Sequence, residues 1–179
     1  IINGAFRSAG QRCSALRCLY EQEDIADRLI RMLKGAMDTL VVGDPWHLST
    51  DVGPVLAEAA KLKIASHIAA AAKTGRLLHQ VDMPDGGHFV PPTALRVNGI
   101  RNLKEEIFGP VLHIATFKAD ALDQVIDDIN ATGYGLTFGL HTRIDDRVQH
   151  IVDRVQAGNI YVNRNQIGAV VGSQPFGGE

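Results

Sequence analysis

Hydrophobic positions follow two spacings along the chain, and their alternation predicts helices interleaved with strands. Apolar residues three and four positions apart predict helices, whereas short apolar or alternating runs predict strands. Helical spacing occupies residues 2–10, 24–40, 57–73, 119–130 and 145–156. Strand-like runs occupy residues 16–20, 91–97, 111–117, 135–142 and 159–163. The expected fold class is therefore α/β, a mainly parallel, open, twisted sheet with flanking helices, because long helices between strands allow parallel crossovers.

The limits of the first long helix can also be predicted. Asp24 is a candidate N-cap, because its carboxylate can accept a hydrogen bond from a free backbone N–H of the first turn. The sequence VGDP at residues 42–45 should end the helix region, since glycine and proline interrupt helices. The residues expected to share its apolar face are Ile25, Leu29, Met32, Leu33 and Leu40.

Size, charge and cysteine content narrow the class of protein. The chain has 179 residues, the length of one domain, and a formal net charge of −2 without a basic cluster. We therefore expect a small-molecule partner and no nucleic acid contacts. Its two cysteines, Cys13 and Cys18, form no CxxC pair, and the histidines show no metal-ligand spacing, so neither a disulfide framework nor a metal site is expected. This pattern favours the reducing cytoplasm.

Cys13 is the candidate nucleophile. It lies in SAGQRCSALR (residues 8–17), where its neighbours are small and Arg12 is adjacent. Thiolate is the nucleophilic form of cysteine, and small neighbours leave room for a substrate carbonyl beside the Cys13 amide, a possible oxyanion donor. A packed thiol fits the same composition, so composition leaves both interpretations open. Cys18 falls within an apolar strand pattern and is expected in the core.

Three motifs in order make the chain resemble the aldehyde dehydrogenase superfamily. They are GQRCSA (10–15), EEIFGPV (105–111) and QPFGG (174–178). Residues 9–17 and 159–179 are similar to the L-glutamate γ-semialdehyde (1-pyrroline-5-carboxylate) dehydrogenase branch, and within it to the bacterial bifunctional proline utilization A enzymes. The resemblance covers almost the whole chain.

The resemblance implies a reaction and a larger parent. In this family a proline dehydrogenase domain uses FAD to form pyrroline carboxylate, and the aldehyde dehydrogenase part oxidises the hydrolysed semialdehyde to L-glutamate with NAD. Residues 1–179 would be the cysteine-bearing catalytic domain, truncated at both ends. The NAD-binding Rossmann and proline dehydrogenase domains would lie elsewhere in the parent. A homo-oligomer and a cytoplasmic location are implied, with peripheral membrane association left open.

The resemblance also implies roles for single residues. Cys13 would attack the aldehyde and later carry a thioester that water cleaves. Glu106 would accept hydrogen bonds from the nicotinamide ribose hydroxyls, and Phe108 would press against the nicotinamide. Without the resemblance, the simpler interpretation is that Glu105 and Glu106 are solvated and that Phe108 only packs.

A second set of residues would bind the substrate. In the semialdehyde branch, Ser14 and the amides of Gly168 and Ala169 would bind the α-carboxylate, and Phe176 would flank the aliphatic chain. Small residues suit this role because amides can approach a carboxylate closely where no side chain intervenes. In isolation, however, a turn hydroxyl and a loop bend explain Ser14, Gly168 and Ala169 equally well.

The sequence lacks parts that a complete dehydrogenase needs. It contains no Gly-rich turn of the dinucleotide-binding type between a strand and a helix, and no candidate general-base glutamate before Cys13. We therefore expect the 179-residue chain by itself to be nearly inactive. Three alternatives remain: an inert packing or oligomerisation module, an aldehyde dehydrogenase without carboxylate selectivity, and a thiol esterase that uses Cys13 alone.

Overall fold

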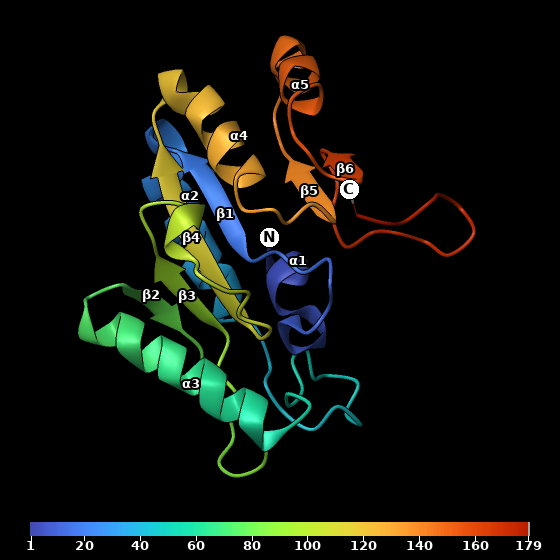
Figure 1. The fold of residues 1–179 in the computed structure, drawn as a ribbon. Helices are drawn as coiled ribbons and strands as arrows, with labels where there is room; N and C mark the ends of the chain where they lie inside the picture. The colour runs from blue at the N-terminus through green and yellow to red at the C-terminus, as the bar shows by residue number, and fades with distance from the viewer. Residues whose placement is uncertain (179) are drawn as a thin grey trace.

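Four strands form the main sheet, in the order β1-β4-β3-β2 (Figure 1). The computed structural model describes residues 1–178. Strands β1 (Cys18–Gln22), β4 (Val111–Phe117) and β3 (Thr93–Arg96) run parallel. Strand β2 (Leu77–Gln80), which the sequence pattern did not predict, pairs antiparallel with β3 at one edge. The expected mainly parallel α/β class is confirmed.

A second, two-stranded parallel sheet lies beside the first. It consists of β5 (Thr137–Leu140) and β6 (Asn159–Val162), with helix α5 (Asp145–Val152) as the connection between them (Figure 1). Helix α5 ends four residues earlier than the pattern predicted. The strands of this small sheet fall within the predicted runs.

Helices cover both faces of the main sheet. Helix α2 (Glu23–Met37) lies behind it in Figure 1, whereas α3 (Glu58–Lys73) and α4 (Leu122–Asn130) lie in front. Short 3-10 turns span Ile100–Asn102 and Ala119–Ala121. The largest side chains buried between these layers are Phe6, Met37, Leu95, Leu112, Ile114 and Ile126.

The predicted N-cap of α2 is wrong, and its predicted apolar face is confirmed only in part, at Leu33. The helix begins at Glu23 after Gln22, so Asp24 lies in the first turn and does not cap the helix. The buried face consists of Ala26, Ile30, Leu33 and Met37, while Ile25 and Met32 are 55% and 63% exposed. Because the apolar residues cover more than one face, only contact with the sheet decides which of them are buried.

The opening helix is shorter than its spacing predicted. Helix α1 (Ile2–Phe6) is followed by a turn over Arg7–Gly10, in which Ser8, Ala9 and Gly10 have φ angles of 55°, 53° and 64°. A run of left-handed residues cannot continue an α-helix. The turn instead redirects the chain toward Cys13, and β1 then starts two residues later than predicted.

Candidate active site around Cys13

Cys13 lies at the end of the main sheet where strands β1 and β4 begin, and two loops meet there. One loop connects the Arg7–Gly10 turn to β1, and the other carries Glu106 and Phe108 into β4. Because β1 and β4 are parallel neighbours, the segments that precede these strands lie at the same end of the sheet. The Cys13 side chain is exposed there, so the structure favours an accessible thiol over a packed one.

A close backbone contact fixes the two loops together. At Gly10, where φ is +64°, an added Cβ would lie 2.1 Å from the carbonyl oxygen of Gly109. Only glycine can occupy such a position without displacing the neighbouring backbone. Gln11 adds two side-chain contacts, since it donates to the carbonyl of Phe108 at 3.4 Å and accepts from the amide of Leu56 at 2.9 Å.

Arg17 joins these loops through its side chain. Its guanidinium donates to Glu106 Oε1 at 2.8 Å, to the carbonyl of Arg12 at 3.0 Å and to the carbonyl of Gly10, while Gly109 lies at 3.4 Å. The guanidinium carbon also lies 4.7 Å from the centre of the Phe108 ring. Burial lowers the pKa of Arg17, and the hydrogen bond and charge of Glu106 and the charge of Cys13 oppose that shift.

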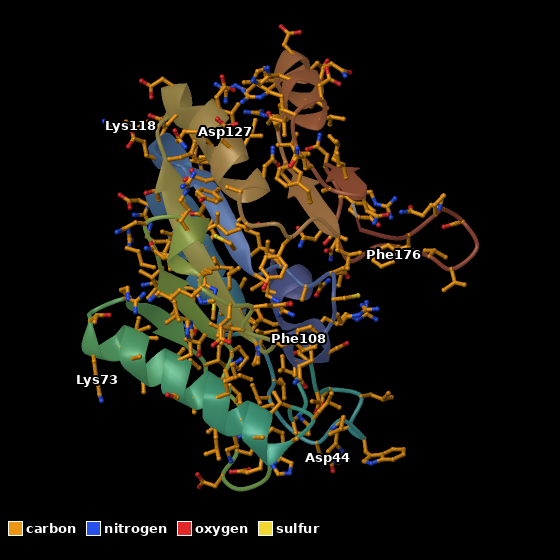
Figure 2. All side chains as sticks on the ribbon, viewed as in Figure 1. Asp44, Lys73, Phe108, Lys118, Asp127 and Phe176 are labelled. Carbon is orange, nitrogen blue, oxygen red and sulfur yellow. The ribbon has the colours of Figure 1, made fainter. Side chains whose placement is uncertain are left out.

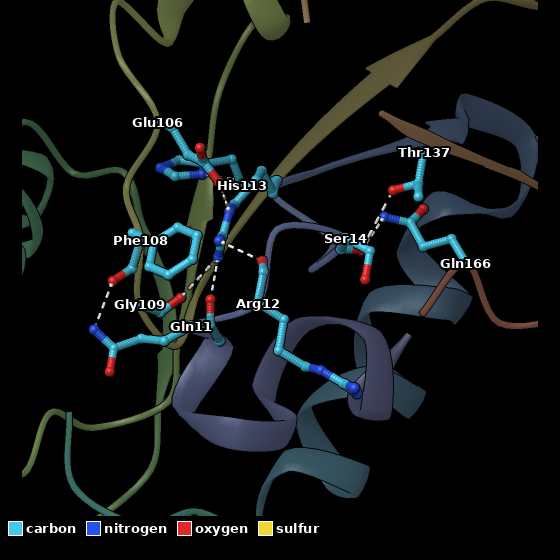
Figure 3. Close-up of polar contacts among 11 residues, drawn as sticks. Gln11, Arg12, Ser14, Glu106, Phe108, Gly109, His113, Thr137 and Gln166 are labelled. Atoms are coloured by element: carbon cyan, nitrogen blue, oxygen red, sulfur yellow. Dashed lines mark hydrogen bonds and ion pairs between the residues drawn. The ribbon is translucent and has the colours of Figure 1, made fainter. Parts of the chain in front are cut away.

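The predicted cofactor residues, Glu106 and Phe108, lie beside the Arg17 guanidinium (Figure 3). The Glu106 side chain is 34% exposed, although Oε1 is paired with Arg17. Phe108 is 39% exposed. The structure therefore brings Cys13, Glu106 and Phe108 to the same end of the main sheet. Part of the Glu106 carboxylate and part of the Phe108 ring remain accessible there.

Ser14 connects the cysteine turn to the small sheet. Its carbonyl accepts hydrogen bonds from Thr137 Oγ1 at 3.5 Å and Gln166 Nε2 at 3.2 Å (Figure 3). The residue as a whole is only 7% exposed. Gln166 lies in the loop after β6, so this loop and the cysteine turn are held against each other.

The remaining predicted substrate residues lie in the C-terminal segment. The Gly168 amide donates to the carbonyl of Asn165 at 3.2 Å, so this N–H is used within its own turn, whereas Ala169 is exposed. Phe176 is 45% exposed and lies on a different segment from Phe108, as Figure 2 shows. Beside Phe176, the carbonyl of Gly177 accepts a 2.7 Å hydrogen bond from Asn159.

The buried His113 and the partly exposed His67 form a pair near the cysteine turn. His113 Nδ1 is 2.9 Å from the carbonyl of Arg17, and its Nε2 is 2.8 Å from Nε2 of His67. A carbonyl only accepts, so Nδ1 donates to it and Nε2 accepts from His67. Burial is the main reason that the pKa of His113 is lowered to about 4, and the ring is therefore neutral at pH 7.

Within residues 1–178, no group of three or more His, Cys, Asp or Glu side chains is placed to hold a metal ion. No helix among them has the length and apolar character needed to cross a membrane. Cys18 is partly buried at the start of β1, at the margin of the core, and burial raises the pKa of its thiol to about 12.

Arg17 and Gln166 belong to this site, although neither was predicted from the sequence. Arg12 was the expected cation beside Cys13, but Arg17 contacts both loops. A signal was present, because an arginine next to an apolar strand must find partners if it is buried. Gln166 had no comparable signal, since its role depends on how β6 lies relative to the cysteine turn.

Comparison with known proteins places this geometry in a family. A family model described as the aldehyde dehydrogenase family matches residues 1–179. The bifunctional protein PutA of Klebsiella aerogenes is 47% identical over 187 residues, an alignment that covers 100% of this chain and 14% of PutA. A 1-pyrroline-5-carboxylate dehydrogenase of Bacillus cereus is 37% identical over 181 residues, covering 99% of this chain and 35% of that protein.

A solved structure agrees with these relatives. A crystal structure of a proline utilization A (PutA) mutant from Bradyrhizobium japonicum has a TM-score of 0.96 and 52% identity, covering 99% of this chain and 18% of that one. The chain thus spans well under half the length of the relatives it matches. Because the family model covers every residue and the fold agrees, the chain belongs to the aldehyde dehydrogenase family.

Proposed function

We propose that this chain is the cysteine-bearing catalytic part of an NAD-dependent dehydrogenase that oxidises L-glutamate γ-semialdehyde to L-glutamate in proline catabolism. The observation that carries the proposal is the meeting of the exposed Cys13 turn with the Glu106 and Phe108 loop. The similarity to PutA and to a 1-pyrroline-5-carboxylate dehydrogenase supports the choice of substrate.

In the proposed reaction, the Cys13 thiolate bonds to the aldehyde carbon and forms a hemithioacetal. We assign the Cys13 amide as a hydrogen-bond donor to the oxyanion that develops on the substrate oxygen. When bound, NAD supplies the acceptor for the hydride that this carbon loses. Cys13 then holds the acyl group as a thioester, and water cleaves that bond to release glutamate and the free thiol.

The accessible groups near Cys13 fit part of a nicotinamide site. Glu106 has one carboxylate oxygen on Arg17 and a side chain that remains one-third exposed, so it can accept hydrogen bonds from ribose hydroxyls. Phe108 offers exposed ring surface against which a nicotinamide can pack. We assign these two residues to the cofactor, and the rest of the NAD site to a Rossmann domain outside this chain.

We assign the substrate carboxylate to Ser14 and to the loop that contains Gly168 and Ala169, with Phe176 beside the aliphatic chain. Gln166 supports this assignment, because its hydrogen bond to Ser14 ties the loop to the cysteine turn. The Gly168 amide would have to leave Asn165 to bind a carboxylate, whereas the exposed Ala169 needs no such change.

The length of the relatives supports a larger parent protein. We propose that the parent also carries a proline dehydrogenase domain with FAD, forms a homo-oligomer and works in the cytoplasm. PutA is described as bifunctional, and this chain covers only 14% of it. Peripheral binding of the parent to the inner face of the membrane would be compatible with this arrangement.

Steady-state kinetics of the full-length protein tests the proposed function. We expect NADH formation from L-glutamate γ-semialdehyde, with a lower kcat/KM for an uncharged aldehyde of similar length, and no activity in Cys13→Ala. A Cys13→Ala protein should still bind NAD, which serves as its control for folding. Ester hydrolysis without NADH formation would instead support the thiol esterase alternative, and no turnover at all would support the inert module.

A further inference from the structure

We infer that Arg17 is a positioning residue for the cofactor, and that it acts through Glu106. This inference rests on the proposed function, which places Glu106 at the nicotinamide ribose. Arg17 itself is largely enclosed, with 15% of its side chain exposed, so it orients groups that contact the cofactor.

The geometry of the guanidinium carries the first step. Its Nε donates to Glu106 Oε1 at 2.8 Å and its Nη2 donates to the carbonyl of Arg12 at 3.0 Å, while Nη1 is directed to Gly10 and Gly109. One planar group therefore holds the carboxylate at a fixed angle to the turn that presents Cys13. With Oε1 restrained, the other oxygen of Glu106 keeps a defined direction.

Phe108 gives a second, independent contact to the same guanidinium. The guanidinium carbon lies 4.7 Å from the centre of the ring, within the range of a cation–π interaction. Arg17 thus restrains both proposed cofactor residues from the side of the sheet. The main chain of Arg17 is itself held, because its carbonyl accepts from the buried His113.

A lysine at position 17 could not make the same set of contacts as Arg17. Its ammonium is a point charge on a flexible stem, whereas the arginine fork presents donors in one plane and stacks on aromatic rings. Lysine would keep the positive charge near Glu106 but would not fix the carboxylate, the two loop carbonyls and the ring together. Arg17→Lys therefore separates charge from geometry.

Kinetics of the full-length protein with both substrates tests the inference. We expect Arg17→Gln to raise the KM for NAD by about tenfold or more, while the KM for L-glutamate γ-semialdehyde changes by less than about twofold. Arg17→Lys should fall between Arg17→Gln and the wild type. Arg101→Gln is the matched control, because it also removes an arginine–carboxylate pair, with Asp128, and should leave both KM values unchanged.

A double variant shows whether Arg17 acts through Glu106. Glu106→Gln should raise the KM for NAD, and combining it with Arg17→Gln should raise the KM by clearly less than the product of the two single effects, because coupled residues are not additive. Multiplied effects in the double variant would overturn the inference. Wild-type NAD kinetics in Arg17→Lys would overturn it too, and this variant serves if Arg17→Gln does not fold.

Binding measurements separate this inference from the proposed function. If the wild-type protein bound NAD but did not oxidise the semialdehyde, the proposed substrate would be wrong, yet calorimetric titration with NAD would still compare the Arg17 variants. A Kd for NAD about tenfold weaker in Arg17→Gln than in Arg101→Gln would support the inference. Equal Kd values would overturn it.

Discussion

Cys13 and Cys18 are close in sequence, but their surroundings give them different chemistry. Cys13 is exposed in a turn that Arg17 and Gly10 hold against the β4 loop. Cys18 is partly buried on β1, and its raised pKa, about 12, leaves almost no thiolate at neutral pH. Sequence composition could not separate the two interpretations of Cys13, because exposure depends on the three left-handed residues that precede it.

Ser14→Ala should weaken substrate selectivity more than chemistry. A bound carboxylate loses water and needs donors, and a charge-assisted hydrogen bond contributes roughly 1.5 to 3 kcal/mol. We expect kcat/KM for glutamate semialdehyde to fall about tenfold or more, equivalent to about 1.4 kcal/mol, with little change for an uncharged aldehyde. Steady-state kinetics on both substrates measures this. An equal loss on both would show that Ser14 serves the turn, and the low exposure of Ser14 makes that comparison essential.

His113 should make stability depend on pH below neutrality. Its pKa in the folded protein is about 4, below the ordinary 6.5, so the unfolded chain binds the proton more tightly. The contribution of neutral His113 to the free energy of unfolding is full above about pH 6.5 and is lost as pH falls through 4, a change of about 3 kcal/mol at most. The difference in the free energy of unfolding between the wild type and His113→Gln should therefore decrease as the pH is lowered from 6.5 to 4.

The comparison with His113→Gln is needed because Glu21 acts in the opposite direction. Glu21 is buried on β1, and its carboxylate oxygens have no hydrogen-bond partner among residues 1–178. Burial raises its pKa to about 7, so its contribution is full below its ordinary pKa and is lost as pH rises through 7. A constant difference between wild type and His113→Gln from pH 7 to 4 would show that His113 is not the group that titrates.

At the scale of elements, the predicted strands and helices were most accurate where one pattern was long and clear. Strand β4 occupies the predicted residues 111–117, and α3 lies within residues 57–73. Strand β2 was missed because it is short and its pairing with β3 is a long-range contact. The meeting of the two loops at Cys13 likewise depends on the parallel pairing of β1 with β4, which no local pattern specifies.

Gly10→Ala should destabilise the junction of these loops more than a glycine's φ angle alone explains. Gly75 has a similar φ of +68° and nothing within 4 Å of an added Cβ, so Gly75→Ala measures the backbone strain by itself. At Gly10 the added carbon also meets the backbone of Gly109. We expect Gly10→Ala to cost at least about 2 kcal/mol more in the free energy of unfolding than Gly75→Ala. Equal losses in denaturant unfolding would contradict the close contact.

At the scale of the whole molecule, our proposal is that the chain supplies one part of an active site that a second domain completes. We propose Glu106 and Phe108 for the nicotinamide end of the cofactor, and the sequence contains no Gly-rich dinucleotide-binding turn. The motifs around Cys13 predicted the family, whereas the hydrogen-bond partners of Ser14 and Glu106 could be found only from the fold.

The 179-residue chain by itself should therefore form little or no NADH from an aldehyde. Positioning of the cofactor and activation of the hydrolytic water require groups that this sequence does not supply. The measurement is NADH absorbance with the purified chain, compared with the full-length protein at equal concentration. Robust NADH production by the chain would show that its cofactor site is complete.

The most direct test of the account is to trap the acyl group on the enzyme. Full-length protein is mixed with L-glutamate γ-semialdehyde and NAD, quenched rapidly in acid, digested and analysed by mass spectrometry. The account predicts a thioester on the peptide that contains Cys13, appearing with the first NADH formed and absent without NAD. NADH formation with an unmodified Cys13 throughout, or with the acyl group on Cys18, would contradict it.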